Sequence, residues 1–405
     1  MRRINVGDLK IRQEEEHAIL EVLRSGRISE GKKVKKFEDR FAEYIGTKYC
    51  VAVNSGTSAL VVGLLALQYD ERFPKVRKNA KVITSPVTYI ATVNALVLSG
   101  YEPVFADIDK HTFKLNMDEV ATIIENNKDE YAGILPVHLM GYPNDMETID
   151  KLARENDLFV FEDAAQAHGS MYKGKKLGAI GLLSDFSFYI AHNIQVGEMG
   201  CVCTNDEPLY KLLKQLKANG RLCSCAICTR NKGICPGFAK YEHKYDFDYD
   251  PRFMHEYISY NFKTTEFTAA IGLTQLSQAD YIAKKRKENV TYLNKYLSNY
   301  QDIFYLPVYS DDVSYLAYPM IIKENSKISR RWIRKKLEEN GIETRPLFGC
   351  IPTQQPAFNN LKTQYNGKLP MADYVGKNAF YLGCHQYLEE EDLYYIVKVF
   401  RHTLD

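Results

Sequence analysis

Strands that alternate with helices are the feature that most restricts how this chain can fold. Short apolar runs predict strands, and amphipathic stretches between them predict helices. The predicted strands cover residues 49–53, 81–85, 103–107, 131–137, 158–162, 186–190 and 200–204, and the predicted helices cover 58–68, 90–98, 117–126, 146–156 and 207–219. This repetition predicts a mostly parallel sheet with helices on both faces. Such sheets bind ligands beyond the carboxyl ends of their strands, so we expect functional residues in the loops that follow strands.

The composition excludes several classes of protein. The 405 residues carry 53 Lys and Arg against 51 Asp and Glu, and this net charge of +2 argues against a nucleic-acid binder. Hydrophobic residues make up 45% of the chain and charged residues 26%, as in a globular protein. The apolar run at 59–67 is too short to cross a bilayer, and the N-terminus lacks the apolar region of a signal peptide. We therefore expect a cytoplasmic protein without a membrane partner.

The regular alternation stops at residues 221–257. This segment contains a cluster of cysteines and then many aromatic and charged residues, and we interpret it as an excursion on the surface of a large domain. A helix is predicted from about 263–265 towards 299. The predicted elements that follow are strands at 303–306 and 315–322 and helices at 329–340 and 389–402. We therefore predict a large cofactor-binding domain at 1–260, and a connecting helix with a small C-terminal α/β domain at 261–405.

Three loops after predicted strands contain residues that suit a cofactor. The segment 54–58 places a glycine and hydroxyls at the start of a helix, which suits a phosphate but also an ordinary N-cap. Asp163 follows a strand, where a carboxylate can hold a pyridinium nitrogen protonated or simply cap a turn. Tyr89 can stack on a cofactor ring, although such a side chain is more often part of the core. The residue patterns alone leave these alternatives open.

Several motifs occur in an order and spacing that resemble one enzyme family. They include GTSAL at 56–60, EDAAQAHG at 162–169, DFSFYIAHNIQVGEMG at 185–200, SYNFKTTEFTAAIGLTQL at 259–276 and RPLFGCIPTQQPAF at 345–358. Almost from end to end, the chain resembles the pyridoxal-phosphate-binding sugar aminotransferases of the DegT/DnrJ/StrS family. The resemblance implies the fold of fold-type I pyridoxal-phosphate enzymes and a homodimer with sites shared between subunits.

The resemblance also implies roles for residues at matching positions. The positions that match phosphate-binding residues are Thr57, Ser58 and Ser187, and Gly56 beside them is a further candidate for cofactor binding. Tyr89 matches the aromatic residue that stacks on the pyridine ring, and Asp163 matches the acid at the ring nitrogen. Gln166 matches the contact to the ring hydroxyl, and Asn261 matches a residue that reaches the cofactor phosphate of the neighbouring subunit.

His192 stands where the aminotransferases of this family have a lysine. That lysine bonds covalently to pyridoxal phosphate, which an imidazole cannot do stably, although a histidine can still remove a proton at neutral pH. The substitution is similar to that of the sugar 3-dehydrases, a branch of the family. There, pyridoxamine phosphate condenses with the C4 ketone of a nucleotide-linked 4-keto-6-deoxyhexose, and the C3 hydroxyl leaves as water. The resemblance implies that His192 is the base of a dehydratase; an aminotransferase with an artificial Lys→His substitution and an inactive enzyme are the alternatives.

A cluster of cysteines indicates metal or redox chemistry in a cytosolic chain. Its members are Cys223, Cys225, Cys228 and Cys235. Residues 220–225 resemble the Gly-Arg-x-Cys-x-Cys of the 3-dehydrases of CDP- and dTDP-linked sugars that carry a [2Fe–2S] cluster reduced by a reductase. The match is incomplete, because Ala165 occupies the position of an upstream cysteine in that group. Four thiolates also suit a structural zinc ion, so both metals stay open.

Other polar residues give weaker signals. We interpret four further cysteines as buried packing residues, namely Cys50, Cys201, Cys203 and Cys350. Isolated histidines are more often structural than catalytic, and those of the chain include His138, His168 and His255. His243 and Tyr245 are candidates for the sugar-nucleotide pocket or for docking a reductase. Arg345 suits a phosphate or carboxylate, or a surface ion pair.

The sequence therefore favours a pyridoxamine-phosphate-dependent 3-dehydratase of a nucleotide-linked 4-keto-6-deoxyhexose. In this hypothesis a [2Fe–2S] cluster receives electrons from a flavin and iron–sulfur reductase or a ferredoxin. One alternative is an ammonia-releasing dehydratase that glutamate regenerates and whose cysteines hold zinc, and another is a sugar aminotransferase. A catalytically silent regulatory protein with the same fold is a further alternative. The sequence does not distinguish CDP, dTDP and GDP as the nucleotide.

Overall fold

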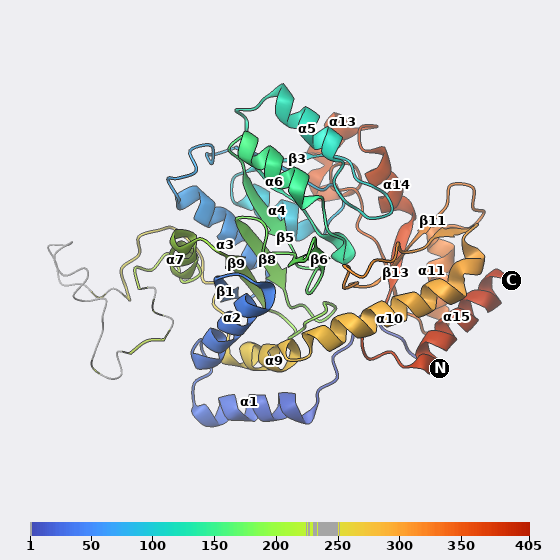
Figure 1. Cartoon of the computed structure of the whole chain (residues 1–405), viewed down its shortest axis with the longest axis horizontal. Coiled ribbons are helices and arrows are strands. Elements are labelled where there is room, and N and C mark those ends of the chain that lie inside the picture. The colour runs from blue at the N-terminus through green and yellow to red at the C-terminus, as the bar shows by residue number, and fades with distance from the viewer. Residues whose placement is uncertain (1, 224, 226, 230–232, 234–249, 251) are drawn as a thin grey trace.

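A computed structural model describes residues 2–223, 225, 227–229, 233, 250 and 252–405 (Figure 1). Its regular elements form a large α/β region around one sheet and a smaller region around a second sheet near the C-terminus. Among the described residues, no helix has both the length and the apolar character needed to span a bilayer.

The main sheet has seven strands in the order β1-β9-β8-β5-β4-β2-β3. In that order they are β1 (Tyr49–Val53), β9 (Gly200–Thr204), β8 (Leu183–Ser187), β5 (Phe159–Asp163), β4 (Tyr131–Leu135), β2 (Lys81–Thr84) and β3 (Glu102–Phe105). Neighbouring strands from β8 to β3 are parallel, whereas β9 is antiparallel to both β1 and β8. This arrangement confirms the mostly parallel sheet that the alternating pattern predicts.

Helices cover both faces of the main sheet. The helices α3 (Gly56–Tyr69), α4 (Ile90–Leu98) and α7 (Glu207–Leu216) share one hydrophobic core with one face of the sheet, and α2 (Lys32–Ile45), α5 (Met117–Asn126) and α6 (Met146–Glu155) share another core with the opposite face. Successive strand residues point to opposite faces, so Phe161 belongs to the α3 side and Val160 to the α6 side. The predicted layers are therefore confirmed.

The helix α3 lies close against the sheet and positions the site. It begins at Gly56, where Ser55 Oγ accepts a hydrogen bond from Ser58 N at 3.1 Å and so caps the first turn. A Cβ at Gly63 would lie 2.5 Å from the Phe161 ring, so only glycine permits this close approach to β5. The N-terminus of α3 is thereby held at the carboxyl end of β1.

The C-terminal sheet is antiparallel, in the order β10-β11-β13-β12. Its strands are β10 (Phe304–Tyr305), β11 (Tyr318–Ile322), β13 (Ala379–Leu382) and β12 (Thr344–Pro346). The helices of this region are α11 (Arg330–Glu339), α12 (Ile351–Gln354), η4 (Pro356–Leu361), α13 (Lys362–Tyr365), α14 (Pro370–Asn378) and α15 (Glu390–Leu404). The smaller C-terminal α/β part is confirmed, while the domain boundary at 260/261 stays a prediction.

The predicted helix from about 263–265 to 299 is wrong, because two helices occupy this segment. The helix α9 (Glu266–Leu276) packs on α1 (Gln13–Ser25) and α2, and α10 (Ala279–Leu297) then crosses to the C-terminal region (Figure 1). The backbone leaves the helical conformation at Gln278, with φ −111° and ψ 7°, which allows the two directions. The remaining short elements are η1 (Leu139–Gly141), η3 (Ser298–Tyr300) and the hairpin of β6 (Met171–Tyr172) and β7 (Lys175–Lys176).

The strand predicted at 186–190 is wrong in position, because β8 ends at Ser187. The strand pairs with β5 on one side and β9 on the other, and these ladders include the polar residues Ser184 and Asp185. Polar residues do not belong to an apolar run, so the sequence pattern favours a strand that includes 188–190 in place of 183–185. The shift makes Asp185 a residue of the sheet and places His192 in the loop that follows.

The described ends of the excursion at 221–257 lie beside each other. Leu222 N donates to Met254 O at 2.9 Å, and Glu256 N donates to Gly220 O at 2.8 Å. Gly220 has φ +70°, and a Cβ at this position would lie 1.9 Å from Tyr257 O, so the contact requires glycine. The two described ends of this segment therefore meet at one place on the main domain.

Candidate active site

A cavity of about 640 Å³ opens at the carboxyl edge of the main sheet. Its walls come from the loop after β1 and the start of α3, the ends of β5 and β8, the loop after β8, and part of the C-terminal region. The predicted site residues that line it are Gly56, Thr57, Tyr89, Asp163, Gln166, Ser187 and His192. Segments far apart in the sequence thus bring most of the predicted site together.

The start of α3 forms an end of the cavity that suits a phosphate. The first N–H groups of a helix have no intrahelical partners and carry partial positive charge. Gly56 and Thr57 provide two of these groups, and both residues line the cavity. Ser187 lies so close that a Cβ at Gly56 would be 2.6 Å from Ser187 Cβ. Ser55 is the N-cap of α3, as one of the two predicted alternatives for this segment requires. Gly56 and Thr57, which follow it, line the cavity.

Two predicted cofactor residues do not line the cavity. Ser58 is buried, and its hydroxyl donates to Asn54 Oδ1 at 2.6 Å. Asn261 is exposed, and its Oδ1 accepts a hydrogen bond from Lys263 N at 3.3 Å. Their roles in cofactor binding stay predictions.

Asp163 is buried at the end of β5 and faces the cavity. One carboxylate oxygen accepts from Thr92 Oγ1 at 2.6 Å and the other from Ala165 N at 3.2 Å. Burial raises the pKa of Asp163, and the bond from Thr92 opposes that rise. The side chain therefore caps its own turn, and it also directs a fixed carboxyl group into the cavity. Both predicted roles of Asp163, the turn cap and the partner of a pyridinium nitrogen, are compatible with the structure.

Tyr89 and Gln166 occupy different parts of the cavity wall. The side chain of Tyr89 is 59% exposed and contacts the Phe348 ring edge-on at a centroid distance of 5.7 Å. This exposure excludes the alternative that Tyr89 belongs to the core. Gln166 is buried, and its Oε1 accepts a hydrogen bond from Met140 N at 3.0 Å, which fixes the amide.

His192 is held with one ring nitrogen committed and the other available. Its Nδ1 lies 2.7 Å from Ser187 O, and a carbonyl oxygen can only accept, so Nδ1 carries the hydrogen. In the neutral ring Nε2 is then an acceptor, and it makes no hydrogen bond to a described residue. Burial lowers the pKa of His192 to about 4, and the nearby Arg286 and Arg345 charges add to the effect. At neutral pH the ring is therefore a base without a proton on Nε2.

The predicted metal cysteines lie in or beside the excursion. Cys223 is half-buried, Cys225 and Cys228 are exposed, and Cys235 falls outside the described residues. Among the described residues, these thiols do not form a group of three or more close enough to share an ion. The four-thiolate site therefore stays a prediction.

Three other sulfurs do lie close together, on β1 and β9. Antiparallel pairing sets Cys50 opposite Cys203 and Cys201 opposite Ala52, and the three Sγ atoms lie within 4.8 Å of one another. All three residues are buried in the core that contains α2. The predicted packing role of these cysteines is confirmed by their burial, whereas their mutual contact requires the strand pairing.

The remaining candidates have structural partners. His138 Nε2 lies 3.0 Å from Glu162 Oε2, and His255 Nδ1 lies 2.8 Å from Asn219 O. His168 stacks on Phe186 and Phe188, and Cys350 is buried. Arg345 lines the cavity and also forms an ion pair with Glu343 at 3.0 Å. His243 and Tyr245 fall outside the described residues.

The cavity also contains polar residues that the sequence analysis missed. Asp185, Glu198 and Thr92 line it, in addition to the predicted residues. Asp185 lies two positions before Ser187 on β8, so the two side chains face the same side of the sheet. Asp185 could have been predicted from its position two residues before Ser187, but only with the correct bounds of β8.

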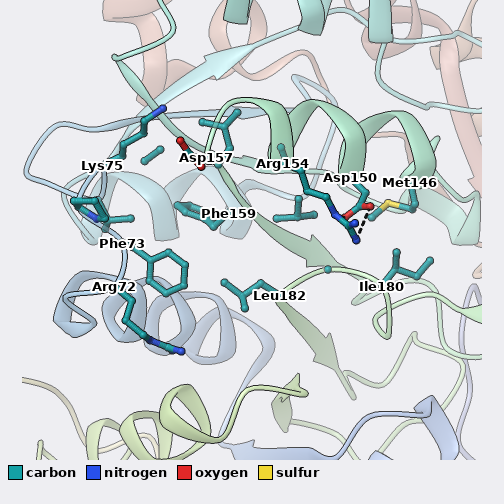
Figure 2. Close-up of a pocket in the computed structure, with 17 residues that line it drawn as sticks. Arg72, Phe73, Lys75, Met146, Asp150, Arg154, Asp157, Phe159, Ile180 and Leu182 are labelled. Atoms are coloured by element: carbon teal, nitrogen blue, oxygen red, sulfur yellow. Dashed lines mark hydrogen bonds and ion pairs between the residues drawn. The ribbon is translucent and has the colours of Figure 1, made fainter.

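A second cavity, of about 670 Å³, opens at the amino ends of β4, β5 and β8 (Figure 2). Figure 2 shows apolar side chains, among them Phe73, Phe159 and Leu182, between α6 and the segment that follows α3. The cationic side chains at its rim are engaged within the protein: Arg154 pairs with Asp150 at 3.0 Å, for example. None of the predicted site residues lines this cavity.

The fold and the first cavity define a class, the fold-type I pyridoxal-phosphate enzymes. The solved structure of Escherichia coli GDP-4-keto-6-deoxy-D-mannose-3-dehydratase with bound hydrated pyridoxal phosphate is similar to this chain, with a TM-score of 0.85 and 25% sequence identity. The match covers 98% of this chain and 99% of that one. The sequence pattern of the DegT/DnrJ/EryC1/StrS aminotransferase family matches residues 9–401, and the chain belongs to this family. It is thus an enzyme of the pyridoxal-phosphate-dependent sugar aminotransferase and dehydratase group.

Curated relatives of the chain carry two kinds of name. GDP-4-keto-6-deoxy-D-mannose 3-dehydratase of Yersinia pseudotuberculosis is 31% identical over 378 residues, which cover 92% of each chain. GDP-perosamine synthase of Escherichia coli O157:H7 is 34% identical over 398 residues, which cover 98% of this chain and 97% of the relative. The degree of similarity alone therefore does not separate a dehydratase from a synthase, and the residues of the site must do so.

Proposed function

We propose that the protein is a 3-dehydratase that uses pyridoxamine phosphate to remove the C3 hydroxyl of a nucleotide-linked 4-keto-6-deoxyhexose. The observation that carries the proposal is the neutral His192 in place of the family's lysine. No lysine is among the described residues that line the cavity, so none of them offers an amine for a covalent bond to the cofactor. Relatives named as 3-dehydratases of GDP- and dTDP-linked sugars support the choice of substrate.

The cavity fits a phosphate-bearing pyridine cofactor. Gly56 leaves no room for a Cβ beside Ser187, so the N-terminus of α3 and the hydroxyls of Thr57 and Ser187 form a cradle for a phosphate. The buried Asp163 carboxyl suits a ring nitrogen, and exposed Tyr89 suits the face of a ring. When bound, the cofactor supplies an electron sink for charge that develops on carbon.

In this proposal His192 is the general base. The hydrogen bond from Nδ1 to Ser187 O holds the ring and selects the tautomer in which Nε2 accepts a proton. The same carbonyl stabilises the imidazolium that forms once Nε2 is protonated, since Nδ1–H donates to it in both states. Asp163, held by Thr92 and by Ala165 N, supplies the negative charge opposite the ring nitrogen. These chain residues therefore provide a base and a counter-charge in one cavity.

For the electron supply we propose that Cys223, Cys225, Cys228 and Cys235 bind a [2Fe–2S] cluster that a reductase reduces. The proposal rests on the sequence spacing, and analysis of iron, sulfide and zinc in anaerobically purified protein tests it. About two irons and two sulfides per chain support it. Zinc alone, or no metal, contradicts it and favours the ammonia-releasing dehydratase that glutamate regenerates.

The dehydration itself is tested by mass spectrometry of the products. The protein is mixed with pyridoxamine phosphate and a panel of GDP-, CDP- and dTDP-linked 4-keto-6-deoxyhexoses, with and without a reductase and glutamate. We expect loss of the C3 hydroxyl with one nucleotide, and we expect His192→Asn to lower the rate about 10²- to 10⁴-fold. His402→Asn, on the exposed face of α15, is the matched control and retains the wild-type rate. An amino sugar that retains its C3 hydroxyl as the main product identifies an aminotransferase and contradicts the proposal.

A further inference from the structure

Asp185 is a buried carboxyl group in the wall of the active-site cavity that the proposed reaction does not yet use. Its side chain is fully buried, and neither carboxyl oxygen has a hydrogen-bond partner in another described residue. A buried polar group without a partner costs free energy and usually marks a place where a bound molecule or water supplies one. Asp185 lines the same cavity as Asp163, Ser187 and His192.

The sheet sets Asp185 directly beside Asp163. The strands β5 and β8 are parallel neighbours, and their register pairs Asp163 with Asp185. Paired residues on adjacent parallel strands point to the same face, and the strands lie about 4.8 Å apart. Two carboxyl groups held side by side in a dry site do not both ionise at neutral pH unless a cation lies beside them, because the second negative charge is repelled by the first.

The hydrogen bonds show which of the two carboxyls carries the charge. Asp163 accepts from Thr92 Oγ1 and from Ala165 N, and such donors stabilise the ionised form. Asp185 has no comparable donor apart from its own backbone N–H. Burial raises the pKa of Asp185 well above its usual range, and Asp163 and, on β9, Cys203 add to this rise. The helix α3, which covers this face, contributes no charged side chain, and the other titratable or charged side chains that line the cavity include His192, Glu198 and Arg345. The donors on Asp163 therefore favour Asp185 as the carboxyl group that keeps the proton.

We propose that Asp163 and Asp185 act as a carboxyl pair that shares one proton and supplies the charge and the proton that the ring nitrogen of the bound cofactor requires. Asp163 touches the ring nitrogen in the proposed function, and Asp185 is a positioning residue that acts through it. The inference rests on the proposed cofactor site, and it does not depend on whether the sugar is dehydrated or aminated. Because the pair already holds a proton, a cofactor with an unprotonated ring can bind without taking one from solvent.

The first test measures the proton on Asp185 without any cofactor. Infrared spectra of cofactor-free protein, with the aspartates labelled by ¹³C, report protonated carboxyl groups by their C=O band. We expect such a band at neutral pH in the wild type and its loss in Asp185→Asn. Ser184→Ala is the matched control, because Ser184 is a buried neighbour on β8 that faces the opposite side and bonds to Gly178 O. A wild-type spectrum without the band, or a band that persists in Asp185→Asn, overturns the shared proton.

The second test measures proton uptake when the cofactor binds. Cofactor-free protein is titrated with pyridoxamine phosphate by calorimetry in two buffers of different ionisation enthalpy, at an alkaline pH where the free ring nitrogen is unprotonated. We expect near-zero uptake for the wild type and for Ser184→Ala, and an uptake approaching one proton for Asp185→Asn, with affinity about tenfold lower. A tenfold change corresponds to about 1.4 kcal/mol.

The outcomes separate the pair from the proposed function. Equal proton uptake by wild type and Asp185→Asn overturns the inference, even if the enzyme dehydrates its sugar. A protonated Asp185 in a protein that binds no pyridoxamine phosphate contradicts the cofactor site and the inference built on it, but not the shared proton. If Asp185→Asn does not fold, circular dichroism shows this, and the wild-type infrared band titrated with pH still decides whether the carboxyl is protonated.

Discussion

Two cavities of similar volume lie at opposite ends of β5, and they differ in how their charges are satisfied. The cavity at the amino end measures about 670 Å³ and the one at the carboxyl end about 640 Å³. At the amino end, Arg154 pairs with Asp150, Arg72 pairs with Asp70, and Lys75 Nζ donates to Asn156 O at 2.6 Å. At the carboxyl end, both carboxyl oxygens of buried Asp185 and Nε2 of half-buried His192 make no hydrogen bond to another described residue.

The volume of a cavity does not identify a binding site in this fold. Charges that are already paired within the chain gain little from a ligand, whereas an unsatisfied buried group gains the hydrogen bond that it lacks. A functional cavity is therefore recognised by its unsatisfied groups, and of these two cavities the one at the carboxyl end contains them.

Glu162 and Asp163, which are adjacent on β5, also differ in how their carboxyl groups are satisfied. Glu162 points to the α6 side, where it is fully surrounded by donors: His138 Nε2 at 3.0 Å, Gly178 N at 2.9 Å, Ile180 N at 2.8 Å and Gly181 N at 2.6 Å. Burial acts to raise the pKa of Glu162, but these hydrogen bonds, led by that from His138, outweigh it and lower the pKa. Glu162 is therefore a structural carboxylate that ties β5 to the loop before β8.

The largest effect is expected from breaking this structural network. Glu162→Ala leaves the buried His138 and three N–H groups without an acceptor, so we expect it to lower the free energy of unfolding by about 3–5 kcal/mol. Urea denaturation followed by circular dichroism measures the loss. Glu155→Ala, at an exposed position of α6, is the control and changes stability by less than about 0.5 kcal/mol. A loss for Glu162→Ala as small as that of the control contradicts the structural role.

The neighbouring residue on the same strand is expected to behave in the opposite way. Asp163→Asn keeps an oxygen for Thr92 but removes the charge in the cavity, so we expect the rate to fall about 10²- to 10³-fold. The free energy of unfolding of the cofactor-free protein should change by less than about 1 kcal/mol, because the buried charge is removed together with its desolvation cost. Steady-state rates and urea titrations of the same preparation measure both quantities. If Asp163→Asn loses stability but keeps the wild-type rate, Asp163 is a structural residue like Glu162, and the proposed difference between the two residues is wrong.

Much of the fold is readable from local sequence. Strands β1 and β9 and helices α4 and α5 occur at the predicted residues, because their hydrophobic patterns and caps are local signals. The helices α1 and α2 were not predicted. The position of β8 was mistaken because its ladder contains Ser184 and Asp185, and polar residues enter a central strand only where the tertiary structure accommodates them.

The sequence predicts those site residues that belong to a single local motif. It does not predict residues that reach the site only through the pairing of distant strands. Asp163 is found from the loop that follows a predicted strand, and Ser187 and His192 are found from the resemblance to the family. Asp185 becomes a neighbour of Asp163 only through the register of β5 and β8, and Cys50 meets Cys203 only through that of β1 and β9. Such long-range pairings are not encoded in any short window of the sequence.

His168, His192 and His385 form no ion pair with a described residue; His168 and His385 are buried, and His192 is half-buried. Burial lowers the pKa of His168 well below its usual value, that of His192 to about 4 and that of His385 to about 3. When the pH falls below about 6.5, the unfolded chain binds protons at these residues before the folded chain does, so folding stability is present above that pH and is lost on acidification. We expect each residue to cost about 1 kcal/mol per pH unit between about pH 6.5 and 4.5.

Urea denaturation at several pH values tests this linkage. The free energy of unfolding should fall with decreasing pH. In His192→Asn the decrease per pH unit should be smaller than in the wild type by the contribution expected from one histidine. His402→Asn, whose side chain is exposed on α15, should keep the wild-type slope. A slope that is unchanged in His192→Asn would mean that His192 takes up its proton equally well in the folded protein, and its assignment as the neutral base would lose its basis.

The smallest effect is expected at the opposite cavity. Arg154 and Asp150 form a pair four residues apart on α6, and the Arg154 side chain is 79% exposed, so solvent screens the interaction. Arg154→Ala should change the free energy of unfolding by less than about 0.5 kcal/mol and leave the rate of the proposed reaction and the affinity for pyridoxamine phosphate unchanged. If the rate changes severalfold while stability does not, the cavity at the amino end of β5 communicates with the site, and paired charges at a cavity rim do not mark it as functionally silent.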